Sequence, residues 1–250
     1  MARTLASLFA VYLVLATAIF VSYAPMPVTG ATDLLPDLRT LSPKQIYIRY
    51  AYVCSNNVCT FTGRELRFSN TVWNGGQGPL ELRGEYNPAS GKTRVWQRIY
   101  STDGSFRERF VGEFVWHAGH NHWHFEKFAL YELWSLSSKG SLKNVVVSSH
   151  KITFCIADTE KIAQLIGSPS TAVYNTCGNQ LQGISVGWGD TYGAGIEGQS
   201  LDITNVLDGK YALKSTADPV NRLTESNDNN NAMIIYIKIA KGTVTVLSGP

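Results

Sequence analysis

The most constraining feature of this sequence is a succession of short runs rich in Val, Ile, Tyr, Phe, Trp and Thr, which begins after residue 36. Gly, Asn, Asp and Pro separate the runs, and pairs such as Asp103-Gly104 are typical of turns between strands. Such runs favour strands over helices. We therefore predict an all-β fold, with strands over residues 45–53, 65–71, 80–85, 94–100, 110–115, 121–136, 145–156, 199–202, 209–217 and 232–239.

The runs show no internal repeat and no low-complexity linker, which favours a single β-sandwich-like domain with long loops. Helices should be short and number at most one or two. Residues 160–165 are the best helical candidate, because Gly167 and Pro169 follow as helix-ending residues. A chain of 250 residues can bury a sizeable core, so the fold should hold largely through apolar packing.

The first 31 residues differ from the remainder of the chain. Residues 5–24 contain no charged side chain, Arg3 precedes them, and Pro25, Pro27 and Gly30 follow. Twenty apolar residues exceed the usual core of a signal peptide and equal the length that spans a bilayer. We predict that residues 1–31 are a signal peptide or an N-terminal membrane anchor. The protein would then be secreted, or tethered to a membrane and facing outside.

Export would place the four cysteines in an oxidising compartment, where disulfides form. The simplest of three pairings joins Cys54 to Cys59 and Cys155 to Cys177. A four-cysteine zinc site is the alternative, although the sequence contains no CxxC pair. Lys and Arg number 22 against 19 Asp and Glu, without a basic cluster, so nucleic acid is not an expected partner.

Four of the five histidines lie within eight positions, in the segment 116–124. His120, His122 and His124 alternate, so on a strand their imidazoles would share one face. Three neutral imidazoles suit copper(II) or zinc and leave coordination positions open. His117 breaks the alternation and could support a ligand, shuttle protons or contact a substrate. Histidines bonded to backbone carbonyls are the alternative to a metal site.

Beyond the histidines, several segments resemble the lysyl oxidases, copper amine oxidases that carry a quinone made from their own side chains. The most specific match is 116–124, and the next is 190–196, which contains Asp190-Thr191-Tyr192. The supporting matches are residues 35–38, 128–133, 151–155, 201–206, 209–214 and 225–231. These segments follow the order of the family, so the resemblance implies that residues 32–250 are a lysyl oxidase-like catalytic domain.

The resemblance also implies a reaction and its residues. His120, His122 and His124 match the copper(II) ligands of the family, and Lys151 and Tyr192 match the pair that crosslinks into lysine tyrosylquinone. Such an enzyme oxidatively deaminates primary amines to aldehydes, consumes dioxygen, and releases ammonia and hydrogen peroxide. Its substrate would be a small amine or a lysine on another protein.

Two carboxylates are candidates for the base that removes the α-proton of the substrate. Glu126 has the same strand parity as the three alternating histidines. Asp190 lies two residues before Tyr192. A surface ion pair is the alternative explanation for Glu126, and turn geometry is the alternative for Asp190.

Residues 225–231 are rich in Asn and acidic side chains, which offer the oxygen ligands that calcium requires. In the resemblance this run matches a calcium-binding segment that joins a site near the start of the domain. The implied calcium ligands are Asp37, the carbonyl of Leu38, Glu225, Asn227, Asn230 and Asn231. A polar hairpin loop is the alternative.

Two other functions remain open from the sequence. The histidines could form a three-histidine zinc site whose bound water is the nucleophile of a hydrolase. Alternatively, the chain could be a non-catalytic secreted β-sandwich module that binds copper and calcium. Both alternatives predict that no quinone forms and that Lys151 and Tyr192 are dispensable.

Overall fold

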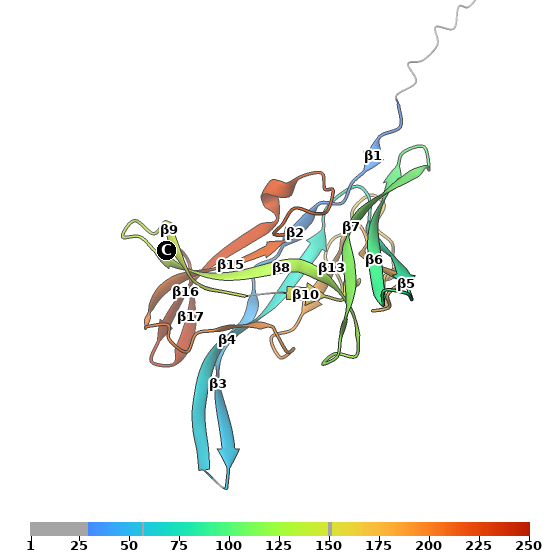
Figure 1. Cartoon of the computed structure of the whole chain (residues 1–250). Helices are drawn as coiled ribbons and strands as arrows, with labels where there is room; N and C mark the ends of the chain where they lie inside the picture. The colour runs from blue at the N-terminus through green and yellow to red at the C-terminus, as the bar shows by residue number, and fades with distance from the viewer. Residues whose placement is uncertain (1–29, 57, 150–151) are drawn as a thin grey trace, which may run out of the picture. The chain divides into compact units, whose positions relative to one another are not determined.

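The computed structural model describes residues 30–56, 58–149 and 152–250, and the second of the chain's two units, residues 31–250, is compact. Within the second unit the strands form two antiparallel sheets (Figure 1). One 3-10 helix, Asp228–Asn230, is the only helical segment among the described residues. The strands are β1 (Asp33–Leu34), β2 (Leu38–Thr40), β3 (Lys44–Ser55), β4 (Val58–Asn74), β5 (Leu80–Asn87), β6 (Lys92–Ser101), β7 (Phe106–His117), β8 (His122–Leu136), β9 (Leu142–Ser148), β10 (Ile152–Phe154), β11 (Glu160–Lys161), β12 (Leu181–Ile184), β13 (Trp188–Tyr192), β14 (Ser200–Asp202), β15 (Gly209–Ala217), β16 (Ala232–Ala240) and β17 (Thr243–Leu247).

The larger sheet is built around β8. Its eleven strands follow the order β12-β5-β6-β7-β8-β15-β16-β17, with β1 paired to β6 and both β9 and β10 paired to β8. The six strands of the smaller sheet follow the order β11-β13-β4-β14, with β2 and β3 also paired to β4. The two longest strands, β4 and β8, therefore organise one sheet each, and segments distant in sequence meet on them.

The all-β prediction is confirmed, and each expected run overlaps a strand. The run at 145–156 is divided into β9 and β10. The predicted helix over residues 160–165 is wrong, because Glu160 and Lys161 pair as a strand with β13. The backbone N–H groups of Ile162 and Ala163 both donate to the carbonyl of Gly187, so they are unavailable for helical hydrogen bonds.

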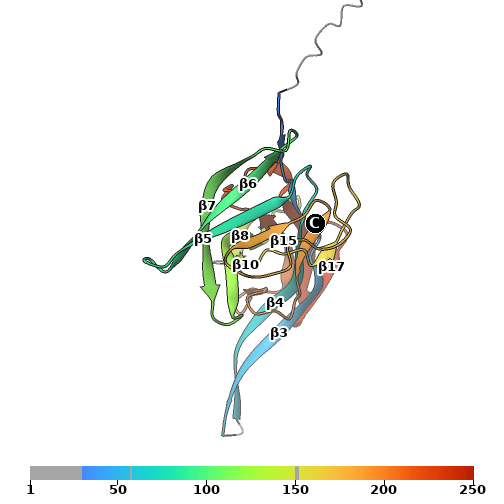
Figure 2. The same cartoon turned by 90° about the vertical axis from the view of Figure 1, so that its right-hand side faces the viewer.

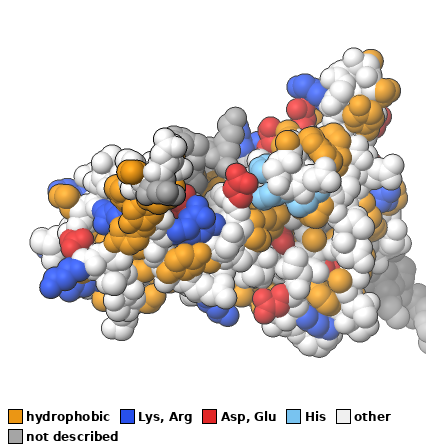
Figure 3. Space-filling model, turned by 90° about the horizontal axis from the view of Figure 1, so that it is seen from below, with side chains coloured by type: hydrophobic (Ala, Val, Ile, Leu, Met, Phe, Trp, Pro, Cys, Tyr) orange, Lys and Arg blue, Asp and Glu red, His pale blue; other side chains and the backbone are white. Residues whose placement is uncertain are grey.

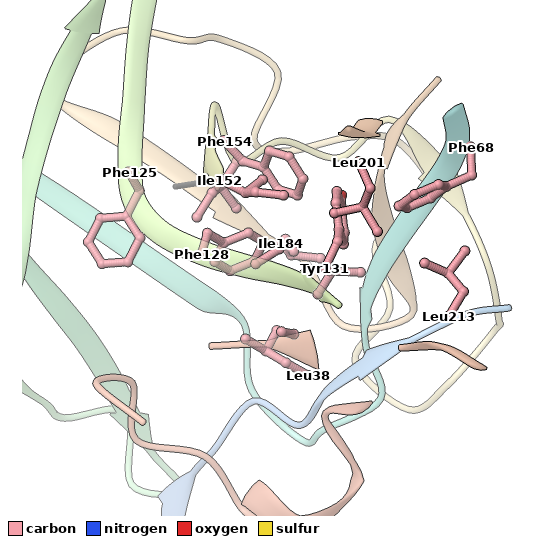
Figure 4. Packing of buried hydrophobic residues seen from close by; sticks show 14 of the residues in the cluster. Leu38, Phe68, Phe125, Phe128, Tyr131, Ile152, Phe154, Ile184, Leu201 and Leu213 are labelled. Atoms are coloured by element: carbon pink, nitrogen blue, oxygen red, sulfur yellow. The ribbon is translucent and has the colours of Figure 1, made fainter. Parts of the chain in front are cut away.

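The core between the sheets is formed by alternating side chains of both (Figure 4). Phe68 on β4 and Tyr131 on β8 meet edge to face, with ring centroids 4.8 Å apart, and both are fully buried. Phe128, Phe154 and Leu213 extend the same cluster. This packing fixes β8 and β10 against β4, which positions the residues described below.

Two disulfides reinforce the second unit. Cys54 is bonded to Cys59 across the end of the β3–β4 hairpin, and Cys155 is bonded to Cys177. The second bond joins the residue after β10 to the long segment before β12. Within the described ranges, no helix has the length and apolar character needed to cross a membrane.

Candidate metal centre

The hairpin formed by β7 and β8 presents the histidine cluster. His117 ends β7 and lies opposite His122, which begins β8, and His124 lies opposite Val115. Residues directly opposite in an antiparallel pair project to the same face. His117, His122 and His124 therefore share one face of the hairpin, while Trp116 and Trp123 pack edge to face with their ring centroids 5.6 Å apart.

His120 reaches the cluster from the turn. The expectation that it lies on the same strand as His122 and His124 is wrong, because β8 begins at His122. The N–H groups of His120 and Asn121 both donate to the carbonyl of His117, at 3.1 and 2.8 Å, which closes the turn. Asn121 has a φ of 56°, a left-handed conformation that asparagine tolerates better than most residues.

The imidazole nitrogens are spaced as ligands of one ion would be. His124 Nε2 is 2.8 Å from His122 Nε2 and 3.4 Å from His120 Nδ1. Two nitrogens bound at about 2.0 Å to one metal ion, at angles between square and tetrahedral, lie about 2.8–3.4 Å apart. The imidazoles of His117 and His124 stack with centroids 4.6 Å apart, and donor atoms of His117, His120 and His124 lie within 4.8 Å of one another.

The surroundings favour the neutral form of His120, His122 and His124. Burial lowers the pKa of His124 to about 3, and the other imidazoles of the cluster add to this effect. The pKa values of His120 and His122 are also lowered, mainly by burial. His124 Nδ1 lies 2.8 Å from Thr153 Oγ1, which leaves Nε2 facing the cluster. Neutral imidazoles in this spacing fit copper(II) or zinc.

Tyr192, at the end of β13, is held rigidly. Its ring stacks on Phe154 at a centroid distance of 3.9 Å and an interplanar angle of 17°. Its hydroxyl donates to the Cys155 carbonyl at 3.0 Å and accepts from the Cys155 N–H at 2.7 Å. Burial raises the pKa of Tyr192 above its ordinary value, and the proximity of Asp190 adds to the shift. Phe154 of β10 therefore fixes the plane of the Tyr192 ring, and the backbone of Cys155 fixes its hydroxyl oxygen.

Two cavities connect Tyr192 with the histidines. The larger, of about 370 Å³, is mostly apolar and is lined by His120, His122, Cys155, Ala157, Thr159, Cys177, Asp190, Thr191, Tyr192 and Ile196. The smaller, of about 60 Å³, is lined by His117, His120, His124, Ile152, Thr153, Phe154, Tyr192, Glu197, Gly198 and Gln199. Figure 3 shows histidine side chains at the surface, next to an acidic side chain.

Asp190 is the carboxylate enclosed by the larger cavity. It is 1% exposed, and among the described residues no regular hydrogen bond reaches its carboxylate oxygens, although the Ala157 backbone N–H lies close enough to lower its pKa in part. Burial raises the pKa of Asp190 well above its ordinary value. A buried carboxylate with so little support from donors binds a proton or an ammonium group strongly.

The other expected residues are placed differently. Glu126 lines neither cavity. Lys151 lies outside the described residues, although the next residue, Ile152, lines the smaller cavity. The sequence did not single out Glu197, whose carboxylate influences the pKa of His120, or Thr153 beside His124. Glu197 carries no local sequence signal, and Thr153 lies in the matched segment 151–155 without being distinguished there, because chain folding alone brings both residues to the cluster.

A second polar cluster joins the start of the domain to residues 225–231. Glu225 Oε2 accepts from the Leu38 N–H at 2.6 Å, and its Oε1 accepts from Asn231 Nδ2 at 2.9 Å. Asp37 Oδ1 accepts from Asn230 Nδ2 at 2.8 Å. The Oδ1 atoms of Asn230 and Asn231 are buried without a partner among the described residues.

The charge of this cluster is poorly balanced by protein groups. Burial raises the pKa of Glu225 to about 8. Arg39 bonds the other oxygen of Asp37 at 2.6 Å and is the cation that pairs with the cluster. Asn227 lies at its edge, where its Oδ1 caps the 3-10 helix by accepting from Asn229 N–H at 3.0 Å. Orphaned amide oxygens beside buried carboxylates fit a hard cation such as calcium.

The fold and the site define a two-sheet β protein with a histidine cluster suited to a metal ion beside a half-buried tyrosine. A family model described as lysyl oxidase matches residues 101–248. The chain therefore belongs to the lysyl oxidase family, as the sequence predicts. This membership supports a copper amine oxidase-like function.

Individual relatives agree with this assignment. The chain is 31% identical over 171 residues to lysyl oxidase homolog 2 of Gallus gallus, covering 68% of this chain and 18% of that protein. It is 36% identical over 128 residues to the protein-lysine 6-oxidase of Gallus gallus, covering 50% of this chain and 27% of that protein. It is 34% identical over 130 residues to the protein-lysine 6-oxidase of Homo sapiens, covering 51% and 28%. The chain thus spans less than a third of the length of these relatives.

Proposed function

We propose that this protein is a copper-dependent amine oxidase that converts primary amines to aldehydes. The observation that carries the proposal is that the imidazoles and Tyr192 line the same cavities. One amine, one dioxygen and one water would yield one aldehyde, one ammonia and one hydrogen peroxide. A lysine side chain of another protein is a candidate substrate, because relatives are named protein-lysine 6-oxidase.

His120, His122 and His124 would hold the copper, and the donor spacing and neutral state of the imidazoles support this choice. Bound copper would supply the redox chemistry by which dioxygen oxidises the Tyr192 ring. The chain itself positions that ring between Phe154 and the backbone of Cys155. His117 stacks on His124 and limits the directions in which that imidazole can move.

Lys151 would crosslink to Tyr192 to form lysine tyrosylquinone. Two facts support the pairing: Lys151 occupies the matching position of the family pattern, and its chain neighbour Ile152 lines a cavity together with Tyr192. The quinone would supply an electrophilic carbonyl and an electron sink. The lysine must lose its proton to act as a nucleophile, which an apolar surrounding favours.

Asp190 would receive the α-proton of the substrate. It precedes Tyr192 by two residues on β13, so both side chains project from the same face of that strand into the larger cavity. Its burial, which the Ala157 backbone N–H offsets only in part, makes it a stronger base than an exposed carboxylate. We propose Asp190 rather than Glu126, since Glu126 lines neither cavity.

The quinone is testable on copper-loaded, aerated protein. Phenylhydrazine should give a coloured adduct, and peptide mass mapping should show one crosslinked species that contains Lys151 and Tyr192. Tyr192→Phe and Lys151→Ala should each lose the adduct and the crosslink, whereas the exposed Tyr86→Phe should keep both. Copper binding without any quinone would contradict the proposal and favour a metal hydrolase or a binding module.

We also propose that the cluster of Asp37, Glu225, Asn230 and Asn231 binds calcium, with the Leu38 carbonyl and Asn227 as further ligands. The orphaned amide oxygens and the raised pKa of Glu225 support this site. Calcium would favour the ionised form of Glu225 and compete with Arg39 for Asp37. Its role would be structural, because the cluster joins β2 to the segment before β16.

We propose further that residues 1–31 direct the chain out of the cell or tether it to a membrane, and that residues 32–250 act outside. The uncharged run at 5–24 supports the first part. The two disulfides support the second, because such bonds persist in oxidising compartments.

A further inference from the structure

The outer halves of β3 and β4 form a two-stranded ribbon that extends beyond the other strands (Figures 1 and 2). Strands β2, β13 and β14 pair with β4 only from Glu65 onward. Residues 58–64 of β4 therefore pair with β3 alone among the described strands. Isolated two-stranded ribbons are marginally stable in water, and the Cys54–Cys59 disulfide holds this one closed.

Beside the polar turn at Ser55 and Asn56, the two strands of this ribbon carry exposed apolar side chains. We call its exposed side chains the ribbon tip, defined as Tyr52 (57% exposed), Val53 (62%), Val58 (67%) and Phe61 (46%). Tyr52 and Phe61 contact each other edge to face, with ring centroids 5.9 Å apart. The two rings therefore stabilise each other's position. Exposed strand ends usually carry charges, which protect them from association. The ribbon tip lacks this protection.

The charge distribution follows a sharp boundary. Residues 50–63 contain no charged side chain, and Arg49 and Arg64 flank them on neighbouring positions of the two strands. Arg49 pairs with Glu65 at 2.8 Å and remains about half exposed, while Arg64 donates to the backbone of residues 203 and 206. Val53 lies four positions from Arg49, which is about 13 Å at the rise of a strand.

We infer that the ribbon tip docks into the boundary between the headgroups and acyl chains of a phospholipid bilayer. The polar turn at Ser55 and Asn56 leads, the exposed Val53 and Val58 lie directly behind it, and aromatic side chains and then arginine follow, which suits a shallow position at the boundary of headgroups and acyl chains. Val53 and Val58 cannot form the side-chain hydrogen bonds that a carbohydrate partner would require. The chain also meets a membrane during export or tethering, because residues 5–24 have the composition and length of a bilayer span.

The test uses the full chain and a tryptophan placed at the ribbon tip. Val58→Trp is compared with Tyr86→Trp, which adds a tryptophan at an exposed position of the β5–β6 hairpin. Both are mixed with vesicles of phosphatidylcholine and phosphatidylglycerol that contain brominated acyl chains. Each added signal is the difference from the wild-type protein, so quenching of native tryptophans by an N-terminal tether cancels.

We expect the Val58→Trp signal to shift to the blue and to lose at least half of its intensity on these vesicles, while the Tyr86→Trp signal stays unchanged. Adding Val53→Asp to Val58→Trp should reduce the quenching about tenfold, since a charge at the interface opposes insertion. Equal quenching at positions 58 and 86 would overturn the inference. A blue shift that appears without vesicles and grows with protein concentration would also overturn it, because a second copy would then cover the ribbon tip.

Discussion

The environment of Asp190 departs strongly from that of an ordinary carboxylate. Water around an exposed aspartate stabilises the charge, but Asp190 is 1% exposed and the Ala157 backbone N–H compensates only in part for the lost water. The cost of the buried charge raises the pKa of this group. From the sequence, Asp190 is a candidate because it lies two residues from Tyr192. Its isolation from solvent depends on how β4 and β12 pack against β13, and residue types do not reveal that packing.

The raised pKa of Asp190 predicts a specific pH dependence of amine oxidation. Below that pKa the group is protonated and cannot accept the α-proton, so kcat/KM should rise with pH through an inflection above the range of exposed aspartates. Asp190→Asn should lower turnover by about 10²–10⁴-fold and remove this inflection. The measurement is a pH profile of aldehyde release, at equal copper and quinone content.

The free energy of unfolding provides a control, because Asp190→Asn should raise it while lowering activity. The folded-state pKa of Asp190 lies above the unfolded value of 3.8, so its contribution to stability is complete below pH 3.8 and is lost as pH rises toward the folded pKa. Asp190→Asn should therefore become more stable than the wild type over this range, by at most about 1.4 kcal/mol per pH unit. A variant that is inactive and also destabilised at alkaline pH would indicate a structural role.

At the scale of elements, the β7–β8 hairpin explains why part of the metal centre was predictable. Alternation places His122 and His124 on one face from sequence alone. The contribution of His117 depends on the pairing of His117 with His122, which the length of the turn determines. Sequence alternation thus suggested three ligands on one strand, whereas the hairpin assembles its histidines from two strands and a turn.

The turn between these strands should control copper affinity through Asn121. A β-branched side chain is strained at a φ of 56°, so Asn121→Val should destabilise the protein by about 1–2 kcal/mol and shift His120. We expect copper affinity to fall about tenfold. Urea unfolding of the metal-free protein and competitive copper titration measure the two effects.

Asn121→Gly is the matched control, because glycine adopts this φ without strain. It should keep stability within about 0.5 kcal/mol of the wild type and retain copper affinity. If glycine and valine weaken copper binding equally, the asparagine side chain rather than the backbone conformation supports the site, and our explanation of the turn is wrong.

At the scale of the whole described unit, contacts between distant segments complete both sites. Glu225 bonds the backbone of Leu38 across 187 positions, and Tyr192 bonds the backbone of Cys155 across 37. The sequence contains the strands that make these contacts, but residue types do not specify which strands lie beside β4. The strands β2, β12, β13 and β17 were missed for a related reason: they are short and gain stability from neighbours rather than from their own composition.

The cluster that joins these segments should make stability depend on calcium. At a calcium concentration 100 times the dissociation constant, binding to the folded state alone adds about 2.7 kcal/mol, which is a rise in Tm of about 5–10 °C for a protein of this size. Glu225→Gln should lose most of this rise, because it removes a buried charge that the cation would neutralise. Thermal unfolding with calcium or a chelator measures the effect, and the exposed Glu85→Gln should respond as the wild type does.

If calcium stabilises Glu225→Gln as strongly as the wild type, the cation binds elsewhere. If it stabilises neither, the buried hydrogen bonds from Leu38 and Asn231 hold the segments together without a metal.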